Sequence, residues 1–226
     1  MFPTLKPACL LLCAAPALAL ADPVVVTTRT SGSATALPVL LTALGMDPAF
    51  ALQELPYSLT LSSTYDPNDM PSVRGDYDYD YDSAIVVDFR LGDMHYRANA
   101  NGASAVLRAA SSGNDTYEHQ VEFLPPDSPW SYKFRQVGIL ALPSLDGAGA
   151  LTPRTLGPTD VVFGTMDITA YTAMPDAPGP SVLLGSTVSS MSVQVVSAVP
   201  EPAPFALLAA GVLTLGLRRR FGRAAP

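Results

Sequence analysis

An alternating run of aspartate and tyrosine is the segment of this chain best suited to chemistry. Its four carboxylates, spaced by two residues, are those of Asp76, Asp78, Asp80 and Asp82. Hard cations take several carboxylate oxygens, and a calcium-binding EF-hand loop uses positions 1, 3 and 5 in this way. The later positions do not match, because Tyr81 stands where that loop needs glycine and Val87 where it needs glutamate. The run therefore predicts a solvated acidic strand or loop with tyrosines packed on the other side, and a divalent-cation site is the weaker alternative.

Catalysis by this run is not expected. In an extended strand, side chains two residues apart share one face at about 6.6–7 Å, which falls in the range of the paired carboxyls of inverting glycosidases. A general acid also needs a carboxyl kept protonated by desolvation, and four exposed neighbours do not supply that. The chain contains no HExxH, GxSxG, phosphate-binding glycine loop or nucleotide fingerprint. We predict a protein that is not an enzyme, with no catalytic residues and no cofactor.

Three other residues have side chains that could bind or react. His95 falls on the polar face of its predicted strand, whereas His119 shares the parity of Tyr117 and Val121 on the apolar face. We expect His119 at the edge of the core, hydrogen-bonded to backbone; a role as ligand or base is the alternative. Trp130, the lone tryptophan, follows a proline-rich loop. We expect its ring to anchor that loop, and stacking on a sugar is the alternative.

Alternation with period two dominates the middle of the chain and predicts β-strands. Residues 57–65 and 85–91 place apolar side chains at odd positions, with Ser63 as the one polar member, and Gly92-Asp93 predicts a two-residue hairpin. Asn101-Gly102 predicts a further reversal. Other strands are expected at 94–98, 103–109, 117–123, 131–140, 161–171 and 188–196. Pro38 to Gly45 predicts one short helix, and Asp47-Pro48 another turn of helix. The fold class is mainly β, an antiparallel sandwich or jelly roll of about eight or more strands.

The N-terminus predicts a secretory signal peptide. Lys6 precedes an apolar stretch that contains both cysteines, Cys9 and Cys13, and the small residues Ala19 and Ala21 mark a cleavage site after Ala21. The exported chain then has no cysteine, which excludes disulfides and thiolate chemistry. The whole chain has 13 basic and 20 acidic residues. Most of the basic residues that lie outside the body, residues 22–200, are in the last nine residues of the chain. The body is therefore strongly acidic, and nucleic acid is not an expected partner.

The C-terminus combines three features in a fixed order. The motif Pro200, Glu201 and Pro202 comes first, an uncharged stretch at 203–217 follows, and the basic cluster Arg218, Arg219 and Arg220 ends it. The stretch is about 22 Å long as a helix, somewhat shorter than the apolar core of a bilayer, and snorkelling arginines can supply part of the difference. The prolines keep the motif extended and exposed outside that helix. The positive-inside rule leaves the body on the outer side of the inner membrane.

This trio resembles the PEP-CTERM sorting signal of exported bacterial proteins. The resemblance implies that an exosortase, a membrane enzyme, recognises Pro200, Glu201 and Pro202 and cuts near them. It covers only the last residues of the chain, so the predicted domains are a signal peptide (1–21), a β domain (22–198) and the sorting signal (199–226). Signal peptidase, exosortase and the membrane are the expected partners. We expect a non-enzymatic protein of the Gram-negative envelope or extracellular polysaccharide matrix; the alternative is a carbohydrate- or calcium-binding module or adhesin.

Overall fold

The computed structural model describes most of the predicted β domain. The described residues are 23–66, 72–74, 77–110, 115–141, 151–172, 181–182 and 184–197. The predicted signal peptide and the sorting signal at 199–226 lie outside these ranges. No helix within the described ranges has both the length and the apolar character needed to span a membrane.

Antiparallel strands make up nearly all of the described structure. They are β1 (Val24–Ala36), β2 (Glu54–Tyr65), β3 (Ser72–Arg74), β4 (Tyr77–Leu91), β5 (Met94–Ala110), β6 (Asp115–Phe123), β7 (Trp130–Leu140), β8 (Arg154–Leu156), β9 (Val161–Thr172), β10 (Ser181–Val182) and β11 (Leu184–Ser197). A short helix α1 (Pro38–Ala43) and a single 3-10 turn η3 (Pro48–Phe50) connect β1 to β2.

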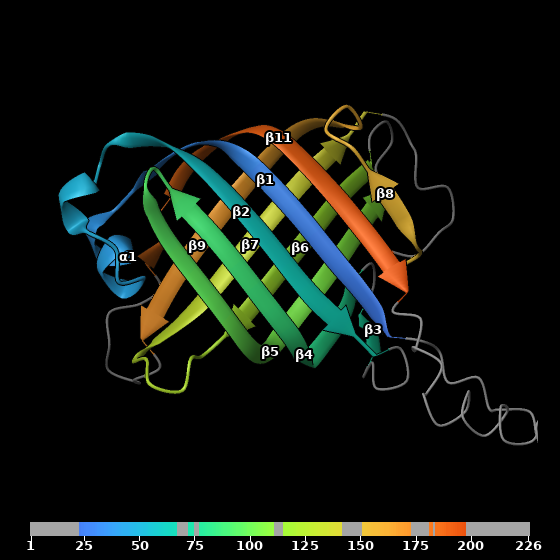
Figure 1. The fold of residues 1–226 in the computed structure, drawn as a ribbon. Coiled ribbons are helices and arrows are strands. Elements are labelled where there is room, and N and C mark those ends of the chain that lie inside the picture. The colour runs from blue at the N-terminus through green and yellow to red at the C-terminus, as the bar shows by residue number, and fades with distance from the viewer. Residues whose placement is uncertain are drawn as a thin grey trace, which may run out of the picture.

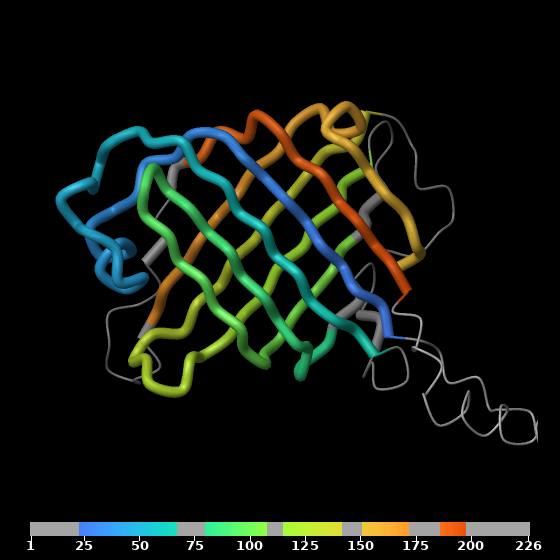
Figure 2. The backbone as a smooth tube through the Cα atoms, in the orientation of Figure 1, coloured from blue at the N-terminus to red at the C-terminus, as the bar shows by residue number. Residues whose placement is uncertain are grey.

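The strands belong to one sheet, in which chain neighbours are mostly sheet neighbours. The order is β10-β9-β7-β6-β5-β4-β2-β1-β11-β8, with β3 pairing to β4 off this path. The sheet curls on itself, so that β9, β7 and β6 cross behind β11, β1 and β2 (Figure 1, Figure 2). Helix α1 lies at one end of the curled sheet (Figure 1). The architecture is therefore a nearly closed sheet built as a meander.

Two glycines on neighbouring strands let the ends of the sheet approach each other. A Cβ on Gly164 in β9 would lie 3.0 Å from Cγ1 of Val188 in β11, and a Cβ on Gly138 in β7 would lie 2.7 Å from the sulfur of Met191. The hydroxyl of Ser186 in β11 also bonds both backbone groups of Met166 in β9. The sheet is thus joined at its ends by close packing and a side chain rather than by a continuous ladder.

Apolar side chains from both layers fill the inside of the curl. One cluster is centred on Leu59, Phe89, Phe134 and Ile168, and a second includes Tyr65, Tyr117 and Val193. The largest of these side chains are fully buried. Burial of each such side chain contributes about 1.5–3 kcal/mol, and these two clusters are the main source of stability of the sheet.

Several predictions from the sequence are confirmed. The odd residues of 57–65 and of 85–91 are buried, and Leu91 pairs with Met94 across a turn in which Gly92 has a φ of 57°. The short helix begins at Pro38, and Gly45 follows it with a φ of 68°. The antiparallel, mainly β class is confirmed.

Two predictions about the fold are wrong. The strands form one curled sheet, not the two sheets of a sandwich, and the jelly-roll alternative is not confirmed by the described part of the chain. Asn101-Gly102 is not a reversal, because β5 runs through it from Met94 to Ala110. Gly102 is needed there for another reason: a Cβ would lie 2.3 Å from the backbone oxygen of Glu122 in β6.

Strand β1 was not predicted from the sequence. Its alternation is hidden because the buried face carries Thr28 and Thr30 where apolar residues are expected. Both hydroxyls have partners inside the sheet, as described below, so these positions are buried without being apolar.

Candidate functional site

The interior contains a histidine held between two hydroxyls. Nδ1 of His119 lies 2.8 Å from Oγ1 of Thr28, and Nε2 lies 2.7 Å from Oγ of Ser63. All three side chains are fully buried. Burial lowers the pKa of His119 to about 3, because the charged ring would lose its hydration. The expectation of a backbone-bonded histidine at the edge of the core is wrong: His119 is fully inside and bonds side chains.

Gln136 makes a second buried polar contact in the same layer. Its Nε2 donates to Oγ1 of Thr30 at 2.9 Å and to the carbonyl of Leu59 at 3.0 Å. Together with His119 it ties β1, β2, β6 and β7 across the inside of the curl. Because both side chains are shut away from solvent and hydrogen-bonded to other strands, they help to specify how these strands pack.

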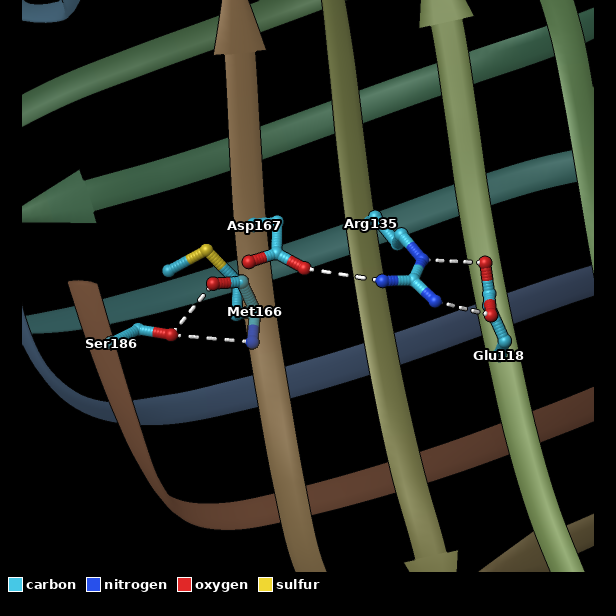
Figure 3. Close-up of polar contacts among 5 residues, drawn as sticks. All are labelled: Glu118, Arg135, Met166, Asp167 and Ser186. Atoms are coloured by element: carbon cyan, nitrogen blue, oxygen red, sulfur yellow. Dashed lines mark hydrogen bonds and ion pairs between the residues drawn. The ribbon is translucent and has the colours of Figure 1, made fainter. Parts of the chain in front are cut away.

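A row of charged side chains lies on the outer surface of β6, β7 and β9, formed by Glu118, Arg135 and Asp167 in that order (Figure 3). Arg135 donates two bonds to Glu118, at 2.6 and 2.9 Å, and one to Asp167 at 3.3 Å. Glu118 is only 4% exposed. The hydrogen bonds that Arg135 makes to Glu118 raise the pKa of the Arg135 guanidinium. This geometry satisfies the buried carboxylate of Glu118 with two bonds, and the same guanidinium makes one longer bond to the partly exposed carboxylate of Asp167.

The aspartate and tyrosine run is a strand with a bulge. Asp80 pairs with Ser104 and Ser83 with Gly102, so Tyr81 and Asp82 have no partner position in the β4–β5 register. Asp80 is 8% exposed, and its Oδ1 accepts the backbone N–H of Asp82 at 2.9 Å. Tyr81, by contrast, is 63% exposed.

The bulge overturns the prediction that the aspartates share one face with the tyrosines packed behind them. The bulge adds one residue to β4, because Tyr81 and Asp82 stand opposite the single residue Ala103 of β5, and this one-residue shift changes which parity points inward, so Asp80 is buried and Asp82 exposed. No group of three potential metal ligands occurs within the described residues. Asp78 is placed only by register, opposite Val106, and Asp76 lies outside the described ranges.

A shallow groove runs beside this bulge along β5. Three hollows of about 440, 580 and 450 Å³ adjoin one another, sharing Asn101 and Leu124 at one junction and Asn99 and Pro126 at the next. Tyr81 and Glu122 line the first hollow, and Arg97 and Asp127 line the last. The groove combines the exposed aromatic ring of Tyr81 with several polar side chains.

The two walls of the groove separate where the β5–β6 ladder ends. Ala103 pairs with Glu122 near the end of β6. Beyond this pair, β5 continues toward Met94, whereas the segment after β6 enters the 124–129 turn. Aromatic rings pack behind the opening: Tyr96 lies 5.6 Å from Tyr132 and Phe123 lies 6.0 Å from Phe134, centroid to centroid. Burial raises the pKa of Tyr96, so its phenol stays neutral.

Trp130 does not form an exposed platform. It is half-buried and packs against the larger core cluster, and its backbone N–H donates to Oγ of Ser128 at 3.0 Å. The prediction of an anchoring ring agrees with this placement. Its neighbour Ser131, not the tryptophan itself, lines the groove.

The remaining site residues expected from the sequence lie outside the described residues. They are the signal-cleavage alanines Ala19 and Ala21, the motif Pro200, Glu201 and Pro202, and the basic cluster Arg218, Arg219 and Arg220. The groove residues Asn99, Asn101 and Glu122 were missed. Their only sequence signal is alternation along a polar strand face, which is common to solvent-facing strands.

Fold and ends define the class of protein: an antiparallel β domain followed directly by a C-terminal sorting segment. The model of the PEP-CTERM protein-sorting motif matches residues 198–220, beginning immediately after β11 ends at Ser197. The motif implies export, membrane-anchored transit and processing by exosortase. No curated protein and no solved structure matches the chain.

Proposed function

We propose that this chain is a non-enzymatic exported protein of the cell envelope or extracellular polysaccharide matrix. The observation that carries the proposal is the sorting motif at 198–220, which follows the last strand without a spacer. Exosortase releases or transfers the β domain after export, and the domain is the part that works at its destination.

The arrangement of the two chain ends supports this proposal. Val24 pairs with Ser197 in the β1–β11 ladder, so the segments that precede β1 and follow β11 leave from the same end of the sheet. Removal of the signal peptide and the sorting signal leaves the β1–β11 ladder intact, because neither Val24 nor Ser197 belongs to these segments. Processing at both ends is therefore compatible with a folded domain.

The C-terminal segment determines how the protein is placed in the membrane during export. The stretch 203–217 crosses the inner membrane, Arg218, Arg219 and Arg220 stay in the cytoplasm, and the domain folds on the outer side. Signal peptidase cuts after Ala21. The domain then moves to the cell surface or the surrounding matrix.

Intact-mass measurement of the protein from its own host tests the sorting step. We expect the mature wild-type protein to begin at Asp22 and to lack the apolar stretch and arginines. In a host without exosortase, the C-terminus should remain intact. A wild-type protein that still ends beyond Arg223 contradicts the proposal.

A matched variant separates recognition from anchoring. Glu201→Gln removes the charge of the motif but keeps the helix and the arginines, so we expect a membrane-bound, uncut protein. Replacement of Arg218, Arg219 and Arg220 by glutamine should instead disturb membrane orientation. Normal processing of both variants would contradict a role for these residues.

A second candidate is a carbohydrate-binding module or adhesin on the same sheet, and the groove beside Tyr81 is the observation that favours it. A calcium-binding form of this module is tested by melting the protein with calcium and with a chelator. Since Asp80 is buried and bonded to the Asp82 amide, we expect equal melting temperatures.

A further inference from the structure

We infer that the groove along β5 binds an extended stretch of a neutral polysaccharide, with Tyr81 as the stacking surface and Asn99 and Asn101 as the main hydrogen-bonding groups. The inference rests on the proposed function only in taking the protein to a polysaccharide-rich location. The groove itself is argued from its own side chains.

The bulge in β4 gives Tyr81 its position. Asp80 and Ser83 keep their ladder partners, so the two residues between them project from the strand. The buried carboxylate of Asp80 accepts the N–H of Asp82, which fixes the backbone of the projection. A largely exposed ring on a fixed backbone presents an apolar face with little loss of conformational entropy on binding.

Gly102 shapes the middle of the groove. With no Cβ, it allows the end of β6 to come close enough that a methyl group would meet the oxygen of Glu122 at 2.3 Å and Cβ of Phe123 at 2.9 Å. Ala84 and Ala103 add little volume to the adjacent lining. Small residues therefore make the hollow between Tyr81 on one side and Leu124 on the other.

The polar groups follow the strand at regular spacing. Asn99 and Asn101 are exposed and lie on the same face of β5, about 7 Å apart. Each amide both donates and accepts hydrogen bonds, which matches the hydroxyls of successive sugar units. From Arg97 to Ala103 the groove is about 20 Å long, so it suits a chain and not a compact ligand.

The charges favour a neutral polymer. Glu122 at one end accepts a hydrogen bond from the hydroxyl of Tyr171, and at the other end Arg97 and Asp127 line the same hollow with opposite charges. The floor between them carries amides and no charged side chain. The formal net charge of −7 also repels nucleic acids and acidic polysaccharides.

Binding of the processed protein to polysaccharides tests the inference. The probes are polysaccharide extracted from the producing cells, the neutral solids cellulose, chitin and curdlan, and alginate as an acidic comparison. We expect saturable binding to at least one neutral polymer, insensitive to moderate salt. Tyr81→Ala should weaken this binding about tenfold, and the double variant Asn99→Ala with Asn101→Ala by a similar factor.

Phe163→Ala is the matched control, because Phe163 is also an exposed aromatic residue, at 59%, but lies on β9 outside the groove. It should bind as the wild type does. Unfolding curves of all variants should superpose, which separates lost contacts from lost folding.

Three results would overturn the inference: no binding of the wild type to any neutral polymer, full binding by the Tyr81 variant, or a preference for alginate. Capture of extended peptides that is unchanged in the Tyr81 variant would instead identify a peptide site. Correct processing of the C-terminus together with any of these results would leave the proposed sorting intact and refute the groove alone.

Discussion

Ser186 in β11 bonds both backbone groups of Met166 in β9: its hydroxyl donates to the carbonyl at 2.6 Å and accepts from the amide at 3.2 Å (Figure 3). The two residues are 20 positions apart and belong to the strands next to the short edge strands β10 and β8 of the sheet order. A single side chain therefore takes the place of a ladder at the point where the curl nearly closes.

Replacement of Ser186 should loosen this closure. In Ser186→Ala both backbone groups of Met166 lose a partner, and we expect a loss of about 1–2 kcal/mol in the free energy of unfolding, measured by urea denaturation. Amide hydrogen exchange should accelerate in β9 and β11 before other strands. Ser58→Ala, at an exposed position on β2, should change stability by less than about 0.5 kcal/mol.

Gly102 should not tolerate a side chain. Gly102→Ala places a Cβ against the backbone of Glu122, so the β5–β6 ladder must shift, at a cost of about 1–3 kcal/mol. Gly157→Ala is the control, because its Cβ would meet only a side-chain oxygen of Asp160, at 3.6 Å. Equal melting temperatures for the two variants would show that the close approach does not constrain the sheet.

The Arg135 guanidinium should matter more than its exposure suggests. Arg135→Leu leaves the nearly buried Glu118 carboxylate without its two strongest bonds, and we expect a loss of about 2 kcal/mol at neutral pH. The double variant with Glu118→Leu should recover much of that loss, since the uncompensated charge is gone. Asp167→Asn, which removes a partly exposed partner, should cost less than about 1 kcal/mol.

The buried histidine should make stability depend on pH. His119 has a pKa of about 3 in the folded protein against 6.5 ordinarily, so between these values the unfolded chain binds the extra proton. Its contribution to stability is thus complete above about pH 6.5 and falls by up to about 1.4 kcal/mol per pH unit below it.

His119→Gln isolates this effect. The variant is expected to be less stable than the wild type at pH 7.5, and the difference should shrink as the pH is lowered to 4, as measured by denaturation at each pH. A difference that stays constant over this range would mean that the histidine is not kept neutral by burial.

Local pattern was enough to predict several strands. The odd positions of residues 57–65 and 85–91 are apolar except for Ser63, and Gly92 supplies the positive φ of the hairpin turn, so these elements can be predicted from neighbouring residues alone. Strand β1 was not predicted, because Thr28 and Thr30 are buried through hydrogen bonds to His119 and Gln136. These partners are distant in the sequence, so no local pattern includes them.

The candidate groove was even less accessible to sequence reasoning. The Asp-Tyr run was identified, but the bulge that buries Asp80 and exposes Tyr81 depends on the register with β5. Asn101 and Glu122 line one hollow only because β5 pairs with β6 and then separates from the segment that leads to β7.

The sequence by itself determined the antiparallel β class and the sorting motif at the C-terminus, because alternation, turn residues and the order of motif, apolar stretch and arginines are all properties of adjacent residues. The tertiary structure alone decided the single curled sheet, the bulge at Tyr81 and the fully buried His119. These depend on which strands pair and in which register, and that choice is made by packing among residues far apart in the chain.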